Sequence, residues 1–172
     1  MLTSFKKWLI IVLASFLMSE VNMAGENKPI EIPIHPVLLE IKTKQGVVSY
    51  SVEIASTPSQ TRAGLMYRTD FPKNHAMLFK NQIGDQLKDK QKFFMWMANT
   101  PLPLDMIFLN NEGIIVSIIE NTSPFSTDII SSEVPAIFAL EVNAGEVFEK
   151  KIEKGQHVIH PAICGECKGN KI

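Results

Sequence analysis

Clusters of lysine and arginine are absent from this sequence, in which 17 basic residues are balanced by 18 acidic ones. Proteins bind nucleic acids mainly by neutralising phosphates with gathered positive charge, so we expect no nucleic-acid partner. Familiar catalytic motifs are absent as well: the chain has no G-x-S-x-G elbow, H-E-x-x-H helix, phosphate-binding loop or dinucleotide fingerprint. The sequence therefore favours a protein that is not an enzyme.

The N-terminal apolar run, residues 8–18, is too short to cross a hydrocarbon core, which needs about 20 helical residues. It follows Lys6 and Lys7 and precedes small residues, and this order is typical of a secretory signal. We predict a signal peptide over residues 1–24, a periplasmic or secreted protein, and no membrane span in the mature form. An uncleaved anchor is the alternative, because Asn22 stands where the cleavage site usually has a small apolar residue.

Cysteine is scarce: the only two are Cys164 and Cys167. Outside the cytosol such a C-x-x-C pair is oxidised unless a metal holds it, so a disulfide is one prediction. Two histidines, His157 and His160, precede the cysteines, and the four side chains together would suit tetrahedral zinc. Against zinc, a spacing of three places the histidines on opposite faces of a strand. An unpaired C-terminal tail over residues 161–172 is the third reading.

Short alternating or apolar segments dominate the rest of the chain. Residues 25–37 carry three prolines and no periodicity, which predicts an extended linker before one domain over residues 38–160. A capping-box pattern begins a short helix at 58–66, and a second short helix is expected at 145–154. The segments predicted as strands are 38–43, 47–54, 76–80, 92–98, 104–110, 114–120, 136–142 and 156–160. We therefore predict a mainly β domain with two short helices, an antiparallel sandwich or barrel.

Six motifs occur in a fixed order along this domain. They are G-L-M-Y-R (64–68), M-L-F (77–79), F-M-W-M-A-N-T (94–100), P-L-D-M-I-F (103–108), Gly113 with Ile115, and L-E-V-N-A-G (140–145). In this combination the chain resembles the domain of unknown function 192 family. The resemblance implies a small β-rich domain, often exported, with no established activity. Ala98 departs from the lysine that the family often has, so an anion-binding role carried over from the family is weakened.

The polar members of these motifs stand at the ends of segments, where ligand sites are commonly built. We predict a cleft for a small ligand or protein partner, lined by Arg68, Trp96, Asn99, Thr100, Asp105 and Glu141. Structural roles are the alternatives. Arg68 and Asp105 would form an ion pair or cap backbone groups, Asn99 and Thr100 would make a turn, and Glu141 would face solvent or Arg68.

Two other functional classes stay open. No cofactor is required by the sequence, but Met66, Met77, Met95, Met97 and Met106 offer soft thioethers that either fill the core or hold copper. On a strand, Met95 and Met97 would share one face and Trp96 would take the other. The last class is a hydrolase or transferase that uses Asp105 or Glu141 with Arg68.

Overall fold

The computed structural model describes residues 27–81 and 90–165, and these form nine strands and three short helices. The strands are β1 (Leu39–Thr43), β2 (Gly46–Ala55), β3 (His75–Lys80), β4 (Lys92–Met95), β5 (Leu104–Leu109), β6 (Ile115–Ile119), β7 (Ile130–Pro135), β8 (Phe138–Asn143) and β9 (His157–Ile159). The helices are α1 (Pro58–Ala63), α2 (Glu146–Glu149) and α3 (Pro161–Cys164). None of the helices in this part of the chain is long and apolar enough to span a bilayer.

Two antiparallel hairpins follow the turn chemistry of the sequence. In β1, buried Leu39 and Ile41 alternate with exposed residues, and Gly46 has the positive φ of +129° at which the chain turns into β2. In the second hairpin, Asn110 accepts hydrogen bonds through Oδ1 from two backbone N–H groups of the turn between β5 and β6. Both hairpins were predicted from the sequence and are confirmed.

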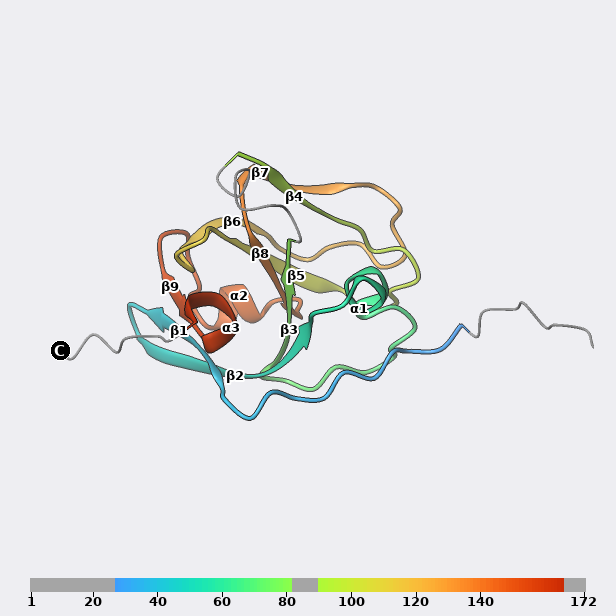
Figure 1. Ribbon diagram of the computed structural model, residues 1–172, viewed down its shortest axis with the longest axis horizontal. Coiled ribbons are helices and arrows are strands. Elements are labelled where there is room, and N and C mark those ends of the chain that lie inside the picture. The colour runs from blue at the N-terminus through green and yellow to red at the C-terminus, as the bar shows by residue number, and fades with distance from the viewer. Residues whose placement is uncertain (1–26, 82–89, 166–172) are drawn as a thin grey trace, which may run out of the picture.

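Seven strands form one sheet in the order β6-β5-β8-β3-β2-β1-β9, and β4 pairs with β7 in a second sheet (Figure 1). The large sheet nearly closes on itself. Ile114 and His157 form an isolated bridge between its two end strands, and Ile115 donates to the carbonyl oxygen of Gln156 over 2.9 Å. Closure removes most of the exposed edge that an open sheet would offer to other chains.

The predicted fold class is confirmed: the domain is mainly β, barrel-like and carries short helices. Three details differ from the prediction. The β2–β3 pair is parallel, because α1 carries the chain back across the sheet between them. The polar strand β7 was not predicted, and α3 begins in the segment that was predicted as tail.

The two faces of the large sheet bury two separate groups of apolar side chains. The inner core takes one residue or more from every strand of that sheet, including Ile41, Val52, Leu78, Ile107, Ile115, Leu140 and Val158. The outer core lies on the other face, under α1 and the small β4–β7 sheet, and includes Met77, Phe79, Phe93, Met106 and Phe108. In the strands β3, β5 and β8, side chains are therefore buried on both faces of the sheet, which strand periodicity alone does not reveal.

Residues 27–37, the described part of the linker predicted over residues 25–37, run alongside β2 at the lower edge of Figure 1. Ile32 is buried, Ile34 pairs with Glu53, and the backbone N–H of His35 donates to Val52 over 2.8 Å. This segment is therefore in contact with the domain, and the carbonyl oxygen of Ile30 serves as a hydrogen-bond acceptor for Arg68. The proposed domain boundary at residue 38 stays a prediction.

Gly64 ends α1 and brings the chain against Phe79. Its φ is +47°, and a Cβ at this position would lie 3.2 Å from the Phe79 ring. We expect Gly64→Ala to lower the free energy of unfolding by about 1–2 kcal/mol, because alanine adds both backbone strain and a contact with a buried ring. Urea unfolding measures this. Gly155→Ala is the matched control, since it has a similar positive φ and no atom near its Cβ, and an equal loss in both variants would exclude the Phe79 contact.

Candidate functional site

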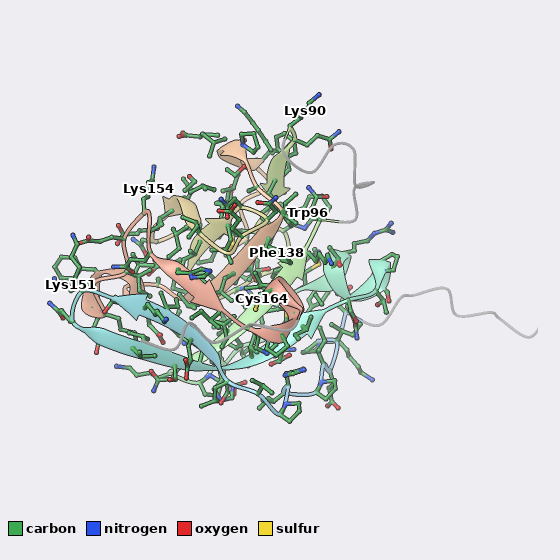
Figure 2. The ribbon with its side chains drawn as sticks, turned by 60° about the vertical axis from the view of Figure 1, so that its left-hand side comes forward. Lys90, Trp96, Phe138, Lys151, Lys154 and Cys164 are labelled. Atoms are coloured by element: carbon green, nitrogen blue, oxygen red, sulfur yellow. The ribbon has the colours of Figure 1, made fainter. Side chains whose placement is uncertain are left out.

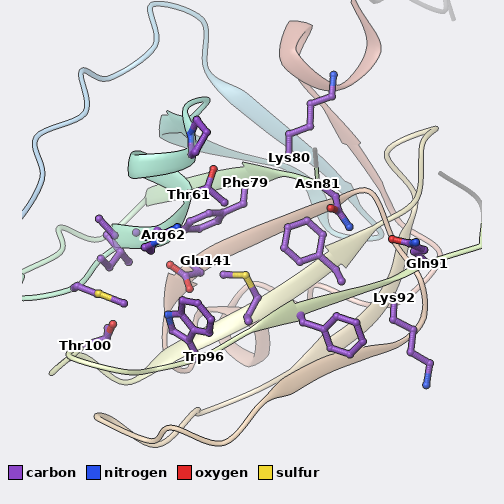
Figure 3. A pocket seen from close by; sticks show the side chains of 18 residues that line it. Thr61, Arg62, Phe79, Lys80, Asn81, Gln91, Lys92, Trp96, Thr100 and Glu141 are labelled. Atoms are coloured by element: carbon purple, nitrogen blue, oxygen red, sulfur yellow. The ribbon is translucent and has the colours of Figure 1, made fainter. Parts of the chain in front are cut away.

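A pocket of about 440 Å³ opens between α1, the end of β3 and β4 (Figure 3). Its walls combine the C-terminal half of α1, the strand end that follows Phe79, and the segment that leads through β4 to Trp96. The lining residues are Pro58, Thr61, Arg62, Ala63, Gly64, Leu65, Met66, Phe79, Lys80, Asn81, Gln91, Lys92, Phe93, Phe94, Met95, Trp96, Thr100 and Glu141. The two sheets and α1 therefore meet at this cavity, which lies well away from Lys151 at the far end of the molecule (Figure 2).

Aromatic rings make up much of the pocket wall. Phe79 and Phe93 are buried and belong to the outer core, whereas 61% of Phe94 and 47% of Trp96 remain exposed at the mouth. Concave, mostly apolar surfaces with a few polar groups are the usual form of small-molecule sites. Of the six predicted cleft residues, the structure brings Trp96, Thr100 and Glu141 to this pocket.

Glu141 contributes a buried carboxyl group to the pocket wall. It lies on β8, paired with Met77 of β3 and Met106 of β5, so it shares the outer face of the sheet with these methionines. Only 3% of Glu141 is exposed, and its Oε2 has no hydrogen-bond partner among the described residues. Burial raises the pKa of this carboxyl to about 8, and the nearby positive charge of Arg68 counteracts only part of the effect.

Arg68 does not line the pocket. Its guanidinium binds Glu53 through two hydrogen bonds, Nη1 to Oε1 at 2.7 Å and Nη2 to Oε2 at 2.5 Å, and Nη2 also donates to the carbonyl oxygen of Ile30. Glu53 lies two strands from Glu141 on the same face, about 10 Å away at ordinary strand spacing. Sequence analysis did not single out Glu53; its one signal is a carboxylate inside the otherwise apolar strand 52–55.

Asp105 faces the opposite side of the sheet from Glu141. It pairs with Val142 of β8, is fully buried, and accepts hydrogen bonds from the backbone N–H groups of Asn121 at 2.8 Å and Val147 at 3.0 Å. Of the two structural roles considered for Asp105, the structure shows the backbone cap. Arg68 and Asp105 therefore do not pair with each other, and neither lines the pocket.

Asn99 and Thr100 form a turn, as one of the two readings of the sequence proposed. Asn99 has a left-handed φ of +57°, and Thr100 donates its backbone N–H to Met97. Asn99 is exposed and outside the pocket lining. Thr100 is buried at the pocket wall, and its hydroxyl donates to the carbonyl oxygen of Ala98 at 3.4 Å.

Three cationic side chains stand around the pocket, all exposed: Arg62, Lys80 and Lys92. The ammonium groups of Lys80 and Lys92 point away from the cavity (Figure 3). Lys80 instead lies over the ring of Phe138, with its Nζ 5.9 Å from the ring centroid. Within the described part of the chain, no hydrogen bond or ion pair joins these cations to Glu141.

The methionines separate into two groups. Met66 and Met95 line the pocket, whereas Met77, Met97 and Met106 are fully buried in the outer core. Met95 and Trp96 both line the pocket, as do Phe93 and Phe94 of β4, so the alternation expected for residues 95–97 does not decide which of them reach it. Thr122 donates to the sulfur of Met97 at 3.3 Å, which gives that thioether a structural contact.

The C-terminal histidines have different partners. His157 contacts the carbonyl oxygen of Glu112 at 2.8 Å, while buried His160 lies 3.1 Å from the ring nitrogen of His35 and caps α3. Among the described residues, no group of three His, Cys, Asp or Glu side chains is arranged to hold a metal. Cys164 ends α3 and is not a free cysteine. Cys167 lies outside the described residues, so both the disulfide and the zinc site stay predictions.

The raised pKa of Glu141 predicts an unusual dependence of stability on pH. The unfolded carboxyl loses its proton near pH 4.5 and the folded one near pH 8, so the native state holds more protons between these values and its stability falls as pH rises. We expect the free energy of unfolding of Glu141→Gln to rise relative to that of the wild type by about 1 kcal/mol per pH unit across this range. Above this range the difference between the two proteins should become constant. Urea unfolding at pH 5, 6, 7 and 8 measures this. A constant difference at all four pH values would show that Glu141 titrates normally.

Comparison with known proteins identifies the family of this chain. The model of the domain of unknown function 192 family, described as "Uncharacterized ACR", matches residues 39–160, which is more than half of the sequence. The chain belongs to this family. The resemblance inferred from the six motifs is thereby confirmed, and every strand of both sheets lies within the matched range or at its edge. A search among curated proteins finds no match.

Two solved structures share the fold of this family member. A protein from Sinorhizobium meliloti 1021, described as a proposed transcription regulator, is 36% identical, with a TM-score of 0.67 over 76% of this chain and 97% of that one. A protein of unknown function from Novosphingobium aromaticivorans DSM 12444 is 25% identical, with a TM-score of 0.66 over 76% and 94% of the two chains. Both likenesses support the barrel-like architecture.

Proposed function

We propose that this domain binds a small, largely apolar ligand in the pocket between α1 and β4 without transforming it. The observation that carries the proposal is the buried Glu141 carboxyl, whose Oε2 has no partner within the described residues although it borders a 440 Å³ cavity. A buried polar oxygen without a hydrogen bond costs about 1–3 kcal/mol, and a ligand that donates to it recovers that cost. The surrounding rings supply the apolar contact area.

The arrangement favours binding over catalysis. Hydrolysis or group transfer would need a nucleophile and a base within hydrogen-bonding reach of each other. The two hydroxyl side chains at the pocket, those of Thr61 and Thr100, instead donate to the backbone carbonyl oxygens of Ala55 and Ala98. No nucleophile among the described lining residues is therefore paired with Glu141, and its role is to bind the ligand.

The apolar fluorescent probe N-phenyl-1-naphthylamine tests the proposal. In the full-length Trp8→Phe variant, Trp96 is the one remaining indole, so its emission reports on the pocket. We expect the probe to bind at micromolar concentrations, to fluoresce more strongly, and to quench Trp96 because both occupy one cavity.

A blocking variant and its control make this test specific. Ala63→Phe places a ring in the pocket wall and should abolish the probe response, whereas Ala63→Ser at the same position should keep it. Thermal unfolding checks that both variants fold. A probe response that survives Ala63→Phe, or is missing from the wild type, would contradict ligand binding at this site.

We propose further that the domain works in the periplasm or outside the cell. The support is the order of basic, apolar and small residues over positions 1–24. A fusion of residues 1–40 to alkaline phosphatase, which is active only where its disulfides form, should be active in a Gram-negative host. Replacement of Lys6 and Lys7 together with a charge inside the run 8–18 should abolish that activity, and an unaffected fusion would contradict export by this segment.

A further inference from the structure

We propose that the ligand of this pocket is an organic cation, a compact amine with an apolar or aromatic body, whose ammonium group lies between Glu141 and Trp96. This inference rests on the proposed binding function and names the chemical class of the ligand. It starts from the fact that Glu141 is the only acidic residue among the described residues that line the cavity.

None of the described cations around the pocket, Arg62 included, forms a hydrogen bond or an ion pair with Glu141. Arg68, the nearest in electrostatic effect, is committed to Glu53 by two hydrogen bonds and to the carbonyl oxygen of Ile30 by a third. Lys80 and Lys92 direct their ammonium groups away from the cavity (Figure 3). A buried carboxyl gains most from a cation with N–H donors, because charge-assisted hydrogen bonds are about twice as strong as neutral ones. No described side chain supplies that cation, and a bound ligand can.

The aromatic wall suits the same group. Trp96 and Glu141 both line the cavity and lie next to each other in the view of Figure 3, and an indole is the ring that attracts a cation most strongly. Buried Phe79 and Phe93 extend the wall with rings that carry no charge and no hydrogen-bond donor. An ammonium group would therefore meet a carboxyl on one side and an indole face on the other, while its body contacts the phenyl rings.

An anionic ligand fits this geometry less well. Its head group would approach Glu141, which offers repulsion when ionised and a single donor when protonated. The three cations that would attract an anion, Arg62, Lys80 and Lys92, are exposed, so solvent and salt screen their charges. The unpartnered buried acid outweighs these exposed charges in the choice of ligand class.

The proposal predicts that the affinity for the ligand depends on pH, because binding is linked to the loss of a proton. The charged groups around the Glu141 carboxyl are those of Arg68, with Glu53 behind it, and of Arg62, Lys80 and Lys92, which line the pocket without pairing with Glu141. Burial keeps the pKa of Glu141 near 8, so an ammonium ion that binds the carboxylate below this pH must displace the carboxyl proton. Its affinity should therefore rise up to tenfold per pH unit between pH 6 and pH 8. A neutral ligand of the same shape displaces no proton and should show no such rise.

Three compounds of similar size distinguish a cationic ligand from a neutral and an anionic one. Displacement of bound N-phenyl-1-naphthylamine is measured at pH 6, 7 and 8 with 2-phenylethylamine, 2-phenylethanol and phenylacetate. We expect the amine to bind at least tenfold more tightly than the alcohol at pH 8, the preference to shrink at pH 6, and phenylacetate to bind most weakly. Glu141→Gln keeps the shape and a hydrogen-bonding oxygen but cannot become charged, so it should remove both the preference and its pH dependence.

The controls distinguish the ligand class from the binding function itself. Glu40→Gln removes an exposed carboxylate on β1 and should leave every value unchanged. A preference for the alcohol or phenylacetate, or an amine preference that persists in Glu141→Gln, would overturn the cation assignment while binding at the pocket stands. Failure of the naphthylamine probe to bind would overturn the proposed function as well.

Discussion

Removal of the Arg68 guanidinium is expected to lower the free energy of unfolding by about 3–5 kcal/mol. Glu53 and Arg68 are largely buried, with 8% and 15% of their side chains exposed, and they hold each other through paired hydrogen bonds. Arg68→Ala leaves the Glu53 carboxylate buried without its cation, which is far costlier than the pair itself is worth. Urea unfolding at pH 7 measures the loss.

Two companion variants test this explanation for Arg68. Arg62→Ala removes an exposed arginine six positions earlier and should cost less than about 0.5 kcal/mol. The double variant Arg68→Met with Glu53→Gln removes both charges and should recover most of the stability, because no unpaired charge remains. If the double variant is no more stable than Arg68→Ala, packing around the arginine matters more than its charge.

Truncation of Asp105 is the other large effect, with an expected loss of about 3 kcal/mol. The carboxylate accepts the backbone N–H of Asn121 at the end of β6 and that of Val147 in the first turn of α2. In Asp105→Ala the buried N–H of Val147 is left without a partner, at about 1–3 kcal/mol, and the part-buried N–H of Asn121 loses its acceptor as well. Thermal and urea unfolding should both report the loss.

An exposed aspartate, Asp128, serves as the matched control for Asp105. Asp128 is exposed and, among the described residues, hydrogen-bonds only to the nearby Ser126, so Asp128→Ala should change stability by less than about 0.5 kcal/mol. A loss below 1 kcal/mol for Asp105→Ala would show that water replaces the carboxylate. If Arg68→Ala and Asp105→Ala both unfold at moderate urea but still bind the naphthylamine probe when folded, both residues are structural supports and not ligand contacts.

Local signals in the sequence predicted the regular elements well. The capping box is present at the start of α1, where the hydroxyl of Thr57 accepts the Gln60 N–H and the Gln60 side chain accepts the Thr57 N–H. The strand β7 escaped prediction because Ile130–Pro135 is polar and ends in proline, which is tolerated only because β7 belongs to a two-stranded sheet. The parallel β2–β3 pair depends on where α1 returns the chain, a long-range choice that no local pattern encodes.

The site was predicted only in part, and Glu141 shows why. In the stretch Leu140–Val142, a carboxylate flanked by two apolar residues is typical of a strand with one face in solvent, so exposure was one expectation. The small β4–β7 sheet and α1 cover that face and bury the carboxyl. Whether a second layer covers a strand face is a tertiary fact, and the same gap left Glu53 unnoticed as the partner of Arg68.

The seam of the barrel constrains how this domain reaches its native state. Glu40 on β1 pairs with Ile159 on β9, close to opposite ends of the folded region, and the bridge from Ile114 to His157 completes the ring. Loops that join such distant residues close slowly, because most of the chain loses freedom before the contact forms. A growing polypeptide lacks β9, the strand that closes the barrel, until almost the whole domain has been synthesised. Loss of residues 157–159 should therefore leave β1 as an open edge that tends to pair with other molecules.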